Sequence, residues 1–456
     1  MQHYEHTHTS DLSASLSCST VAPGTSFDSS CTPIGSGATA SEAPANDGAG
    51  APELGSSFIG MIQRLLERAE FEAVVAVAKD LIGSHPGSLF LNFALGNAHS
   101  NLGNHVEAAR HCRQFLQSTP APQNRAFKVA NTPAMQNNLG LALKDLGLLD
   151  GAEDVFKTLL AGSPDFVPGL INYGNLLNDK SRLDEAKTHF LHAIEVAPED
   201  PLAYWNLHSA ASDISTARAV LEMCLSKDSG NQLTIYTLAG LHAFEGDRSY
   251  FDALVADGLG NDPVIRSIQW ILDQPVMPQI HFNRWSMFDS AIRQADPDRP
   301  FYEFGVWMGD SFRYLIDHFP HGFGFDTFDG LPEDWHGLPR GSYTSFGEVP
   351  NILGGEFVVG EFKDTLPVFF ATRRLKAGLM NFDADLYSST ISALTEASSV
   401  IDERTMLIFD EFIVNHNWEQ DEYRALEEFC RQRGASYEVL AASLFTKQVV
   451  CKLTGL

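Results

Sequence analysis

The ten residues FYEFGVWMGD, at positions 301–310, decide how the C-terminal part of this chain folds. An apolar run containing one acid, Glu303, leads into Gly305 and Gly309, and the helical segment SFRYLIDHF follows. This order predicts a β-strand, a tight turn and a helix, and glycine lets a ligand approach the backbone where the helix begins. By itself the string is too short to identify a nucleotide-type site.

Strand-like runs continue beyond this turn and alternate with helical segments, which is typical of a doubly wound α/β domain. The runs are FYEFGV, GFGFDTF, EFVVGEF, AGLMNFD, TMLIFDEF and KQVVCKL. The second run ends at Asp326, 21 residues after Gly305, where an acid can accept hydrogen bonds from ribose hydroxyls. The third glycine of a dinucleotide fingerprint is missing, which favours a cofactor without a pyrophosphate, such as S-adenosylmethionine. The residues expected to bind it are Glu303, Gly305, Gly309, Ser311 and Asp326.

Three further acids follow two neighbouring strands of the predicted sheet. Asp383 lies in NFDADLYSST (381–390), and Asp410 and Glu411 lie in LIFDEF (407–412). Carboxylates at the ends of adjacent parallel strands meet at one edge of the sheet and repel unless a cation neutralises them. Mg²⁺ or another oxygen-binding divalent ion is therefore the predicted occupant. The alternative is that these acids cap helices and face solvent.

The preceding 200 or so residues show a helical repeat. Gly140 and Gly174 lie 34 residues apart, and each is followed by an alanine, a phenylalanine and a proline in the same frame, with a third unit beginning at Gly96. This pattern resembles the tetratricopeptide repeat. A degenerate unit at 57–87 and irregular units at 200–229 and 232–263 extend the expected solenoid to five or six hairpins, and the ten residues APQNRAFKVA separate its second and third units. We expect a disordered low-complexity segment at 1–56, the repeats at 57–263 and the α/β domain at 264–456.

The strings EFGVWMGDS, FDTFDGLPEDW, GEFKDTLP, FDADLYSST and FDEF, with WEQDEYRALEEF downstream, form a specific set. With them, residues 300–456 resemble the macrocin O-methyltransferase (TylF-like) family of class I S-adenosylmethionine-dependent methyltransferases. The resemblance implies a Rossmann-like, seven-stranded sheet whose last strand, KQVVCKL, is reversed. It also implies a divalent metal at Asp383, Asp410 and Glu411. The glycine pair usual before the metal strand is replaced here by Glu403 and Arg404.

Composition narrows the class of partner. The formal net charge of −27 argues against nucleic-acid binding by phosphate neutralisation. No apolar run of about 18 residues predicts a membrane span and no signal peptide is recognisable, so we expect a cytoplasmic protein. The six cysteines form no CxxC pair, so neither a zinc site nor a disulfide framework is expected.

These patterns together predict an enzyme that transfers a methyl group to a hydroxyl of a sugar or polyol, on a small molecule or a glycan. Mg²⁺ would bind the acceptor hydroxyls, and Asp383 or His416 would take the proton. The repeats would bind a protein partner or support homo-oligomer assembly. Two rivals stay open: a glycosyltransferase that uses DAD as its metal-binding DxD motif, and a repeat scaffold with an inactive methyltransferase domain.

Overall fold

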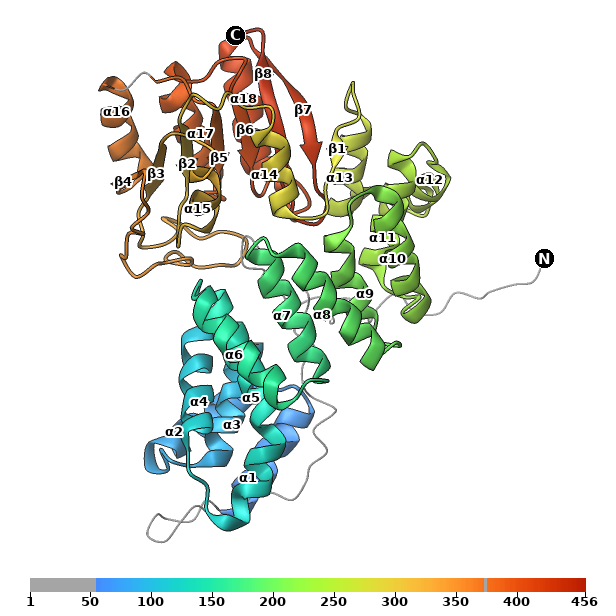
Figure 1. The fold of residues 1–456 in the computed structure, drawn as a ribbon, viewed down its shortest axis with the longest axis vertical. Helices are drawn as coiled ribbons and strands as arrows, with labels where there is room; N and C mark the ends of the chain where they lie inside the picture. Colours follow the sequence, from blue (N-terminus) through green and yellow to red (C-terminus); the bar gives the residue numbers. More distant parts are fainter. Residues whose placement is uncertain (1–54, 373–374) are drawn as a thin grey trace, which may run out of the picture.

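The computed structural model describes residues 55–372 and 375–456. The predicted low-complexity segment at 1–56 therefore lies almost wholly outside the described residues. Two parts are visible in the described chain, a helical solenoid and an α/β part built on one sheet (Figure 1). None of the described helices is long and apolar enough to cross a membrane.

The described solenoid consists of six consecutive helical hairpins. They are α1 (Ser56–Glu67) with α2 (Phe71–Ser84), α3 (Leu89–Asn101) with α4 (His105–Gln117), α5 (Arg125–Asp145) with α6 (Leu149–Gly162), α7 (Val167–Asp179) with α8 (Leu183–Val196), α9 (Pro201–Leu207) with α10 (Ile214–Lys227), and α11 (Gln232–Phe244) with α12 (Ser249–Ala256). Short 3₁₀ turns lie at Pro122–Asn124, His208–Ala210 and Leu259–Asn261.

The repeat glycines are explained by how closely the two helices of a hairpin approach. A Cβ atom added at Gly140 would lie 2.6 Å from the Phe156 ring, and one at Gly174 would lie 2.4 Å from the Phe190 ring. Both rings are fully buried. The 34-residue pattern therefore records a contact between the helices of each unit, and the predicted helical repeat is confirmed.

The ten residues between the second and third units do not form a separate connection. Pro122–Asn124 makes a 3₁₀ turn, and the remainder extends α5 at its N-terminal end, so that α5 is 21 residues long. The insertion thus lengthens one helix of the solenoid.

The α/β part is built on a mixed sheet of eight strands in the order β1-β7-β8-β6-β5-β2-β3-β4. The strands are β1 (Gln279–Ile280), β2 (Phe301–Phe304), β3 (Gly322–Asp326), β4 (Gly355–Val359), β5 (Leu379–Phe382), β6 (Met406–Phe409), β7 (Ser436–Ala442) and β8 (Val449–Thr454). The expected number of seven is wrong by one, because the two-residue β1 pairs in parallel with β7 at the sheet edge. The last strand, β8, is antiparallel to both neighbours, as expected.

Helices cover both faces of the sheet. One face packs against α14 (Arg284–Ile292) and α15 (Asp310–Ile316). The other packs against α16 (Phe362–Thr372), α17 (Tyr387–Glu396) and α18 (Glu422–Arg433), and its core continues into α9–α12 and α13 (Pro263–Leu272). Further 3₁₀ turns lie at Ala397–Ser399 and Trp418–Gln420.

Four stacked phenylalanines lie just beneath the carboxyl edge of the sheet. Phe304 stacks on Phe325 and on Phe382 with ring centroids 5.0 and 5.1 Å apart, and Phe382 stacks on Phe409 at 4.8 Å. All four are fully buried. Because they are matched residues of neighbouring strands, this row aligns the strand ends from which the functional side chains project.

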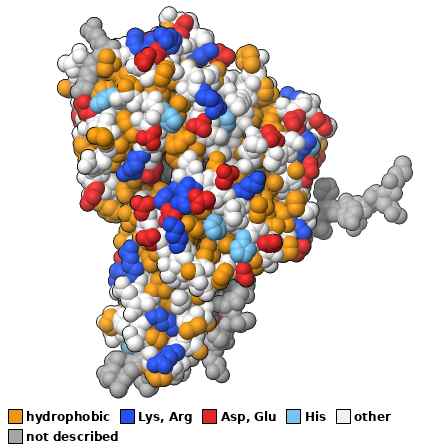
Figure 2. Space-filling model, in the orientation of Figure 1, with side chains coloured by type: hydrophobic (Ala, Val, Ile, Leu, Met, Phe, Trp, Pro, Cys, Tyr) orange, Lys and Arg blue, Asp and Glu red, His pale blue; other side chains and the backbone are white. Residues whose placement is uncertain are grey.

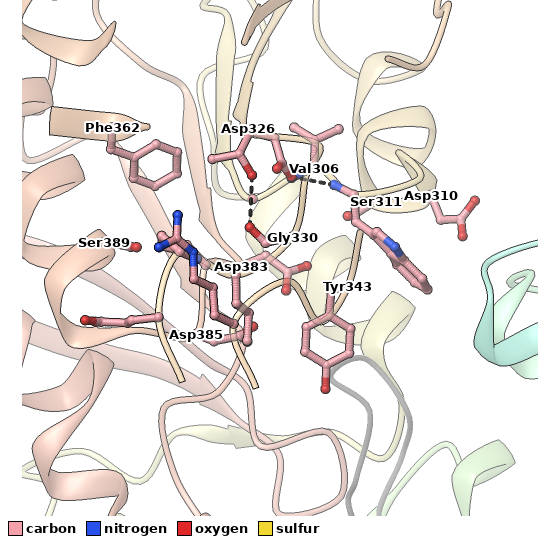
Figure 3. Close-up of a pocket in the computed structure, with 18 of the residues that line it drawn as sticks. Val306, Asp310, Ser311, Asp326, Gly330, Tyr343, Phe362, Asp383, Asp385 and Ser389 are labelled. Atoms are coloured by element: carbon pink, nitrogen blue, oxygen red, sulfur yellow. Dashed lines mark hydrogen bonds between the residues drawn. The ribbon is translucent and has the colours of Figure 1, made fainter. Parts of the chain in front are cut away.

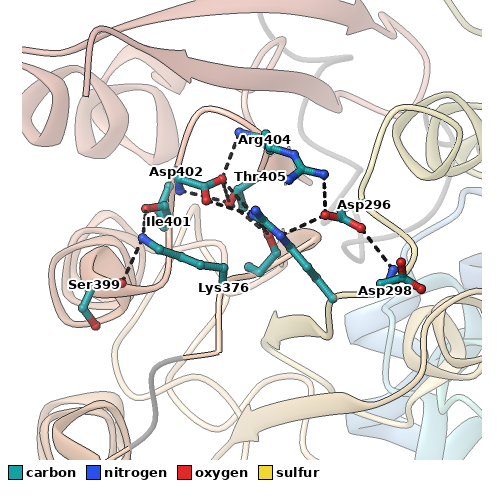
Figure 4. Close-up of polar contacts among 10 residues, drawn as sticks. Asp296, Asp298, Lys376, Ser399, Ile401, Asp402, Arg404 and Thr405 are labelled. Carbon is teal, nitrogen blue, oxygen red and sulfur yellow. Dashed lines mark hydrogen bonds and ion pairs between the residues drawn. The ribbon is translucent and has the colours of Figure 1, made fainter.

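The loop that contains Glu403 and Arg404 lies at the opposite end of the strands, before β6. Arg404 pairs with Asp296 at 2.6 Å, and Arg299 bridges Asp296 (3.1 Å) and Asp402 (2.9 Å) (Figure 4). None of these side chains lines the pocket at the carboxyl edge described next. This loop therefore links the amino ends of the strands through ion pairs and contributes no side chain to the candidate site.

Candidate cofactor and acceptor site

A cavity of about 520 Å³ lies where the carboxyl edge of the sheet meets the solenoid. The sheet side contributes the turn after β2, Asp326 at the end of β3, the residues after β4 and those after β5. The solenoid contributes residues at the C-terminal ends of α5 and α7, namely Lys144, Asp145, Asn178 and Asp179. Acidic and basic side chains also lie next to each other on the surface where the two parts meet (Figure 2).

The glycine turn after β2 is required by the fold itself. Gly305 and Gly309 have φ of +90° and +83°, values that glycine adopts readily. A Cβ atom at Gly305 would lie 1.8 Å from the carbonyl oxygen of Asp383, so the neighbouring strand end alone excludes any side chain there. Gly305 lines the pocket and Gly309 does not.

Asp326 holds this turn in shape. One carboxylate oxygen accepts hydrogen bonds from the backbone amides of Val306 and Trp307, both at 2.7 Å (Figure 3). The other accepts from the amide of Phe328 at 2.7 Å. Asp326 also lines the pocket. Because a carboxylate has about four acceptor sites, it retains capacity for a ligand hydroxyl.

Glu303 does not face the pocket. Its side chain is fully buried between β2 and β5 and accepts a hydrogen bond from the Asn381 amide at 2.8 Å. Burial raises the pKa of Glu303 to about 7, an effect that the neighbouring Ser311 and Asn381 side chains partly offset. Unlike Glu303, Ser311 lines the pocket.

An arginine lies between two of the three predicted metal ligands. The Nη2 group of Arg284 donates to Asp383 Oδ2 at 3.1 Å and to Asp410 Oδ1 at 2.5 Å. The same Asp410 oxygen accepts a hydrogen bond from the Gln448 amide. Asp383 lines the pocket, whereas Asp410, only 1% exposed, lies beneath it.

The third predicted ligand, Glu411, is held by other partners. The Lys447 ammonium lies 3.0 Å from its Oε2, and Asn415 donates to the same oxygen at 2.6 Å. Among the described residues, the group of three His, Cys, Asp or Glu side chains whose ligand atoms converge within 4.8 Å is found in the solenoid, at His99, Glu107 and His111. Asp383, Asp410 and Glu411 are instead paired with neighbouring cations and amides, an arrangement unlike that of a divalent-ion site.

Asp385 is a candidate functional residue that the sequence interpretation treated only as part of a DxD motif. It lines the pocket, is 4% exposed and has a φ of +61°. Its Oδ1 atom has no hydrogen-bond partner among the described residues. Burial, followed by repulsion from Glu411 and Asp410, raises the pKa of Asp385 well above its ordinary value.

Figure 3 shows how the pocket side chains are arranged. Phe362 and Asp326 lie at one end, Asp383 and Asp385 lie in the middle, and Tyr343 lies toward the other end. Burial and the nearby Asp410 raise the pKa of Asp383 well above its usual range, while Arg284 opposes this shift.

His416 is not brought to the site. Its side chain is exposed and does not line the pocket, and its backbone carbonyl accepts a hydrogen bond from Arg266 at 3.2 Å. Three aromatic residues close in sequence to the predicted site, Trp335, Tyr387 and Trp418, do not line the pocket. Trp285, Trp307 and Tyr343 line it instead. Arg284, which also lines the pocket, was not predicted; its position as the single charged residue of HFNRWSMF (281–288) is the signal that could have found it.

Comparison with known proteins gives limited likenesses. None of the curated proteins searched matches the chain significantly. Among solved structures, CalS11, a calicheamicin methyltransferase, is 20% identical with a TM-score of 0.31 over 45% of this chain and 93% of its own. The type IV pilus biogenesis factor PilW is 14% identical with a TM-score of 0.39, over 47% of this chain and 100% of its own. YrrB, a TPR protein with an unusual peptide-binding site, is 15% identical with a TM-score of 0.31, over 40% of this chain and 90% of its own.

One family model matches part of the solenoid. The matched segment, residues 167–200, spans α7, α8 and the turn that follows them. The model is that of the tetratricopeptide repeat, and repeats of this kind stack into extended surfaces that bind other proteins. The chain therefore contains a tetratricopeptide repeat at residues 167–200.

Proposed function

We propose that this protein is an S-adenosylmethionine-dependent methyltransferase that acts on a hydroxyl group. The observation that carries the proposal is the single pocket that joins the glycine turn and Asp326 to Asp383 and Asp385. The first pair provides the contacts that a nucleoside needs, and the second pair provides carboxylates at the place where an acceptor would be deprotonated.

The cofactor half of the pocket suits an adenosyl group. Asp326 has remaining capacity for ribose hydroxyls, and the Phe362 ring offers a flat apolar surface near it (Figure 3). The pocket wall includes eight Asp or Glu residues and four Lys or Arg residues. This excess of acid favours a sulfonium cation over a phosphate-bearing cofactor.

The acceptor half contains the proton acceptor of the proposed reaction. Asp385 takes the hydroxyl proton, the acceptor oxygen forms a bond to the methyl carbon, and the bond from that carbon to sulfur breaks. The sulfonium becomes a neutral thioether, so charge and atoms balance. A carboxyl with a raised pKa is a stronger base than an ordinary one, and the unpartnered Oδ1 of Asp385 is available for the proton.

Calorimetric titration tests this function. In a buffer containing EDTA, we expect one S-adenosylmethionine to bind per chain, and S-adenosylhomocysteine to compete with it. Nucleotide sugars are expected not to bind even when Mg²⁺ replaces EDTA in the buffer, which separates a methyltransferase from a metal-dependent glycosyltransferase. Binding of a nucleotide sugar without binding of S-adenosylmethionine would rule the proposal out.

A further inference from the structure

We propose that Arg284 takes the place of a divalent metal ion in this site, so that a resident guanidinium supplies the positive charge. The role of Arg284 in the reaction rests on the proposed methyl transfer, whereas its contacts with Asp383 and Asp410 do not depend on that proposal. The observation behind it is that a single nitrogen, Arg284 Nη2, contacts both Asp383 and Asp410.

Each of the three predicted ligands already has an oxygen engaged by a neighbouring cation. Asp410 Oδ1 accepts from both Arg284 and Gln448, and Glu411 Oε2 is engaged by Lys447 and Asn415. A hard divalent ion needs about six oxygen ligands around one centre. Here two cationic side chains and two amides engage oxygens that such an ion would need.

Arg284 is held in place from both sides along the chain. Asn283 caps α14 by accepting from the Ser286 amide at 2.9 Å, and its own side-chain amide donates to the Ser209 carbonyl at 3.0 Å. On the other side, the Trp285 indole donates to the Asn178 carbonyl at 2.7 Å. The Arg284 guanidinium also lies over the Phe288 ring, 5.9 Å from its centroid. These contacts on both sides therefore fix the position of the Arg284 side chain.

A guanidinium provides what the acceptor oxygen requires in this reaction. It has five N–H donors and stays charged at any working pH. Arg284 lines the pocket, so donors not used by the two carboxylates can reach an acceptor oxygen and stabilise the negative charge that develops as its proton leaves. Such a charge is not removed by a chelator.

Manganese binding, followed by electron paramagnetic resonance, tests the assignment without knowledge of the acceptor. All variants are made in the full-length protein. We expect the Asp383→Asn variant to bind the same number of Mn²⁺ ions as wild type, because no ion is bound at Asp383. With Arg284→Ala, the two carboxylates are released and we expect one additional Mn²⁺ per chain. The double variant R284A/D383N is expected to lose that additional ion.

Arg404→Ala is the matched control, because Arg404 also pairs with a carboxylate, Asp296, yet lies at the opposite edge of the sheet. It should bind no additional Mn²⁺. If wild-type protein binds an ion that Asp383→Asn removes, the assignment is overturned. This wild-type comparison holds even if Arg284→Ala fails to fold. Titration of the same samples with S-adenosylmethionine reports separately on the proposed function, because cofactor binding is expected to be retained in every variant that folds.

Discussion

At the scale of single residues, Gly305 and Asp326 show that the glycine turn after β2 is determined largely by its own neighbours. Glycine is required at position 305 because a Cβ atom there would lie 1.8 Å from the Asp383 carbonyl oxygen. Asp326 holds the turn by accepting hydrogen bonds from the amides of Val306 and Trp307. The spacing from strand end to acid was readable in the sequence. The hydrogen bonds of Asp326 to its own turn were not, because they depend on how two strands are placed side by side.

Arg284 marks the limit of sequence reasoning at this scale. It lies 99 residues before Asp383 and 126 residues before Asp410, and no local pattern connects positions so far apart. Three acids at one sheet edge predicted a cation there, and the structure places Arg284 and Lys447 beside them. Which cation supplies it depends on the packing of α14, which the sequence does not reveal.

Asp385 gives the first prediction. Asp385→Asn removes the proposed proton acceptor while leaving a side chain of nearly the same shape. We expect methyl transfer to fall by about 10²-fold or more, the usual contribution of a positioned general base, with the affinity for S-adenosylmethionine nearly unchanged. Single-turnover methylation with an identified hydroxyl acceptor and calorimetry measure the two quantities. Equal loss of both would place Asp385 in cofactor binding.

Glu303 gives a prediction about pH. The pKa of its carboxyl is about 7 in the folded protein, against an ordinary value of 4.5. Between these values the unfolded chain has released the proton that the folded protein still holds, so rising pH favours unfolding. The carboxyl should lower the free energy of unfolding by about 3 kcal/mol across this window.

Glu303→Gln removes that titration. The stability of the variant relative to wild type should therefore increase from pH 5 to pH 8, measured as urea midpoints at both values. The comparison is made as a difference because other buried carboxyls, including Asp383 and Glu422, also have raised pKa values. A difference that stays constant with pH would show that Glu303 keeps its proton in neither state.

At the scale of elements, the repeat glycines offer a matched pair of substitutions. Gly174→Ala places a methyl group 2.4 Å from the buried Phe190 ring, whereas nothing lies within 4 Å of a Cβ atom at Gly162, at the end of α6. Overpacking should cost Gly174→Ala about 1–3 kcal/mol of stability. Gly162→Ala should change stability by less than about 1 kcal/mol. Thermal unfolding measures both, and equal effects would contradict the packing explanation.

The strands were predictable where an apolar run is continuous, as in β2, β3, β5 and β6. Two strands were missed for physical reasons. β7 (Ser436–Ala442) begins with an exposed serine, has a glutamate at its third position and is irregular between Val439 and Ala441. β1 has only two residues and exists because β7 offers it a paired edge. Neither carries a strong local signal.

At the scale of the whole molecule, one hydrophobic core crosses from the solenoid into the sheet. The His208 and Trp205 rings lie 4.0 and 6.1 Å from the Phe445 ring, and all three side chains are buried. The same core runs from Tyr204 to Leu453, whereas α1–α8 are held mainly by a separate core. The expected division at residues 263 and 264 would cut through the shared core.

This core predicts how the chain divides. A fragment of residues 200–456 should fold, with near-ultraviolet circular dichroism and a single compact species on size exclusion. A fragment of residues 264–456 should aggregate or lose fixed tertiary packing, because Phe445 and its surroundings would lose the partners supplied by α9–α12. A well-folded shorter fragment would show that the two parts are independent.

The three consecutive residues 283–285 have a mechanical consequence. Asn283 is tied to Ser209 and Trp285 to Asn178, with Arg284 and its two carboxylates between them. A displacement of α7 against the sheet must pull on the guanidinium at the acceptor pocket. The position of the guanidinium is therefore coupled mechanically to the geometry of the repeats, because the Trp285–Asn178 hydrogen bond joins α14 to α7.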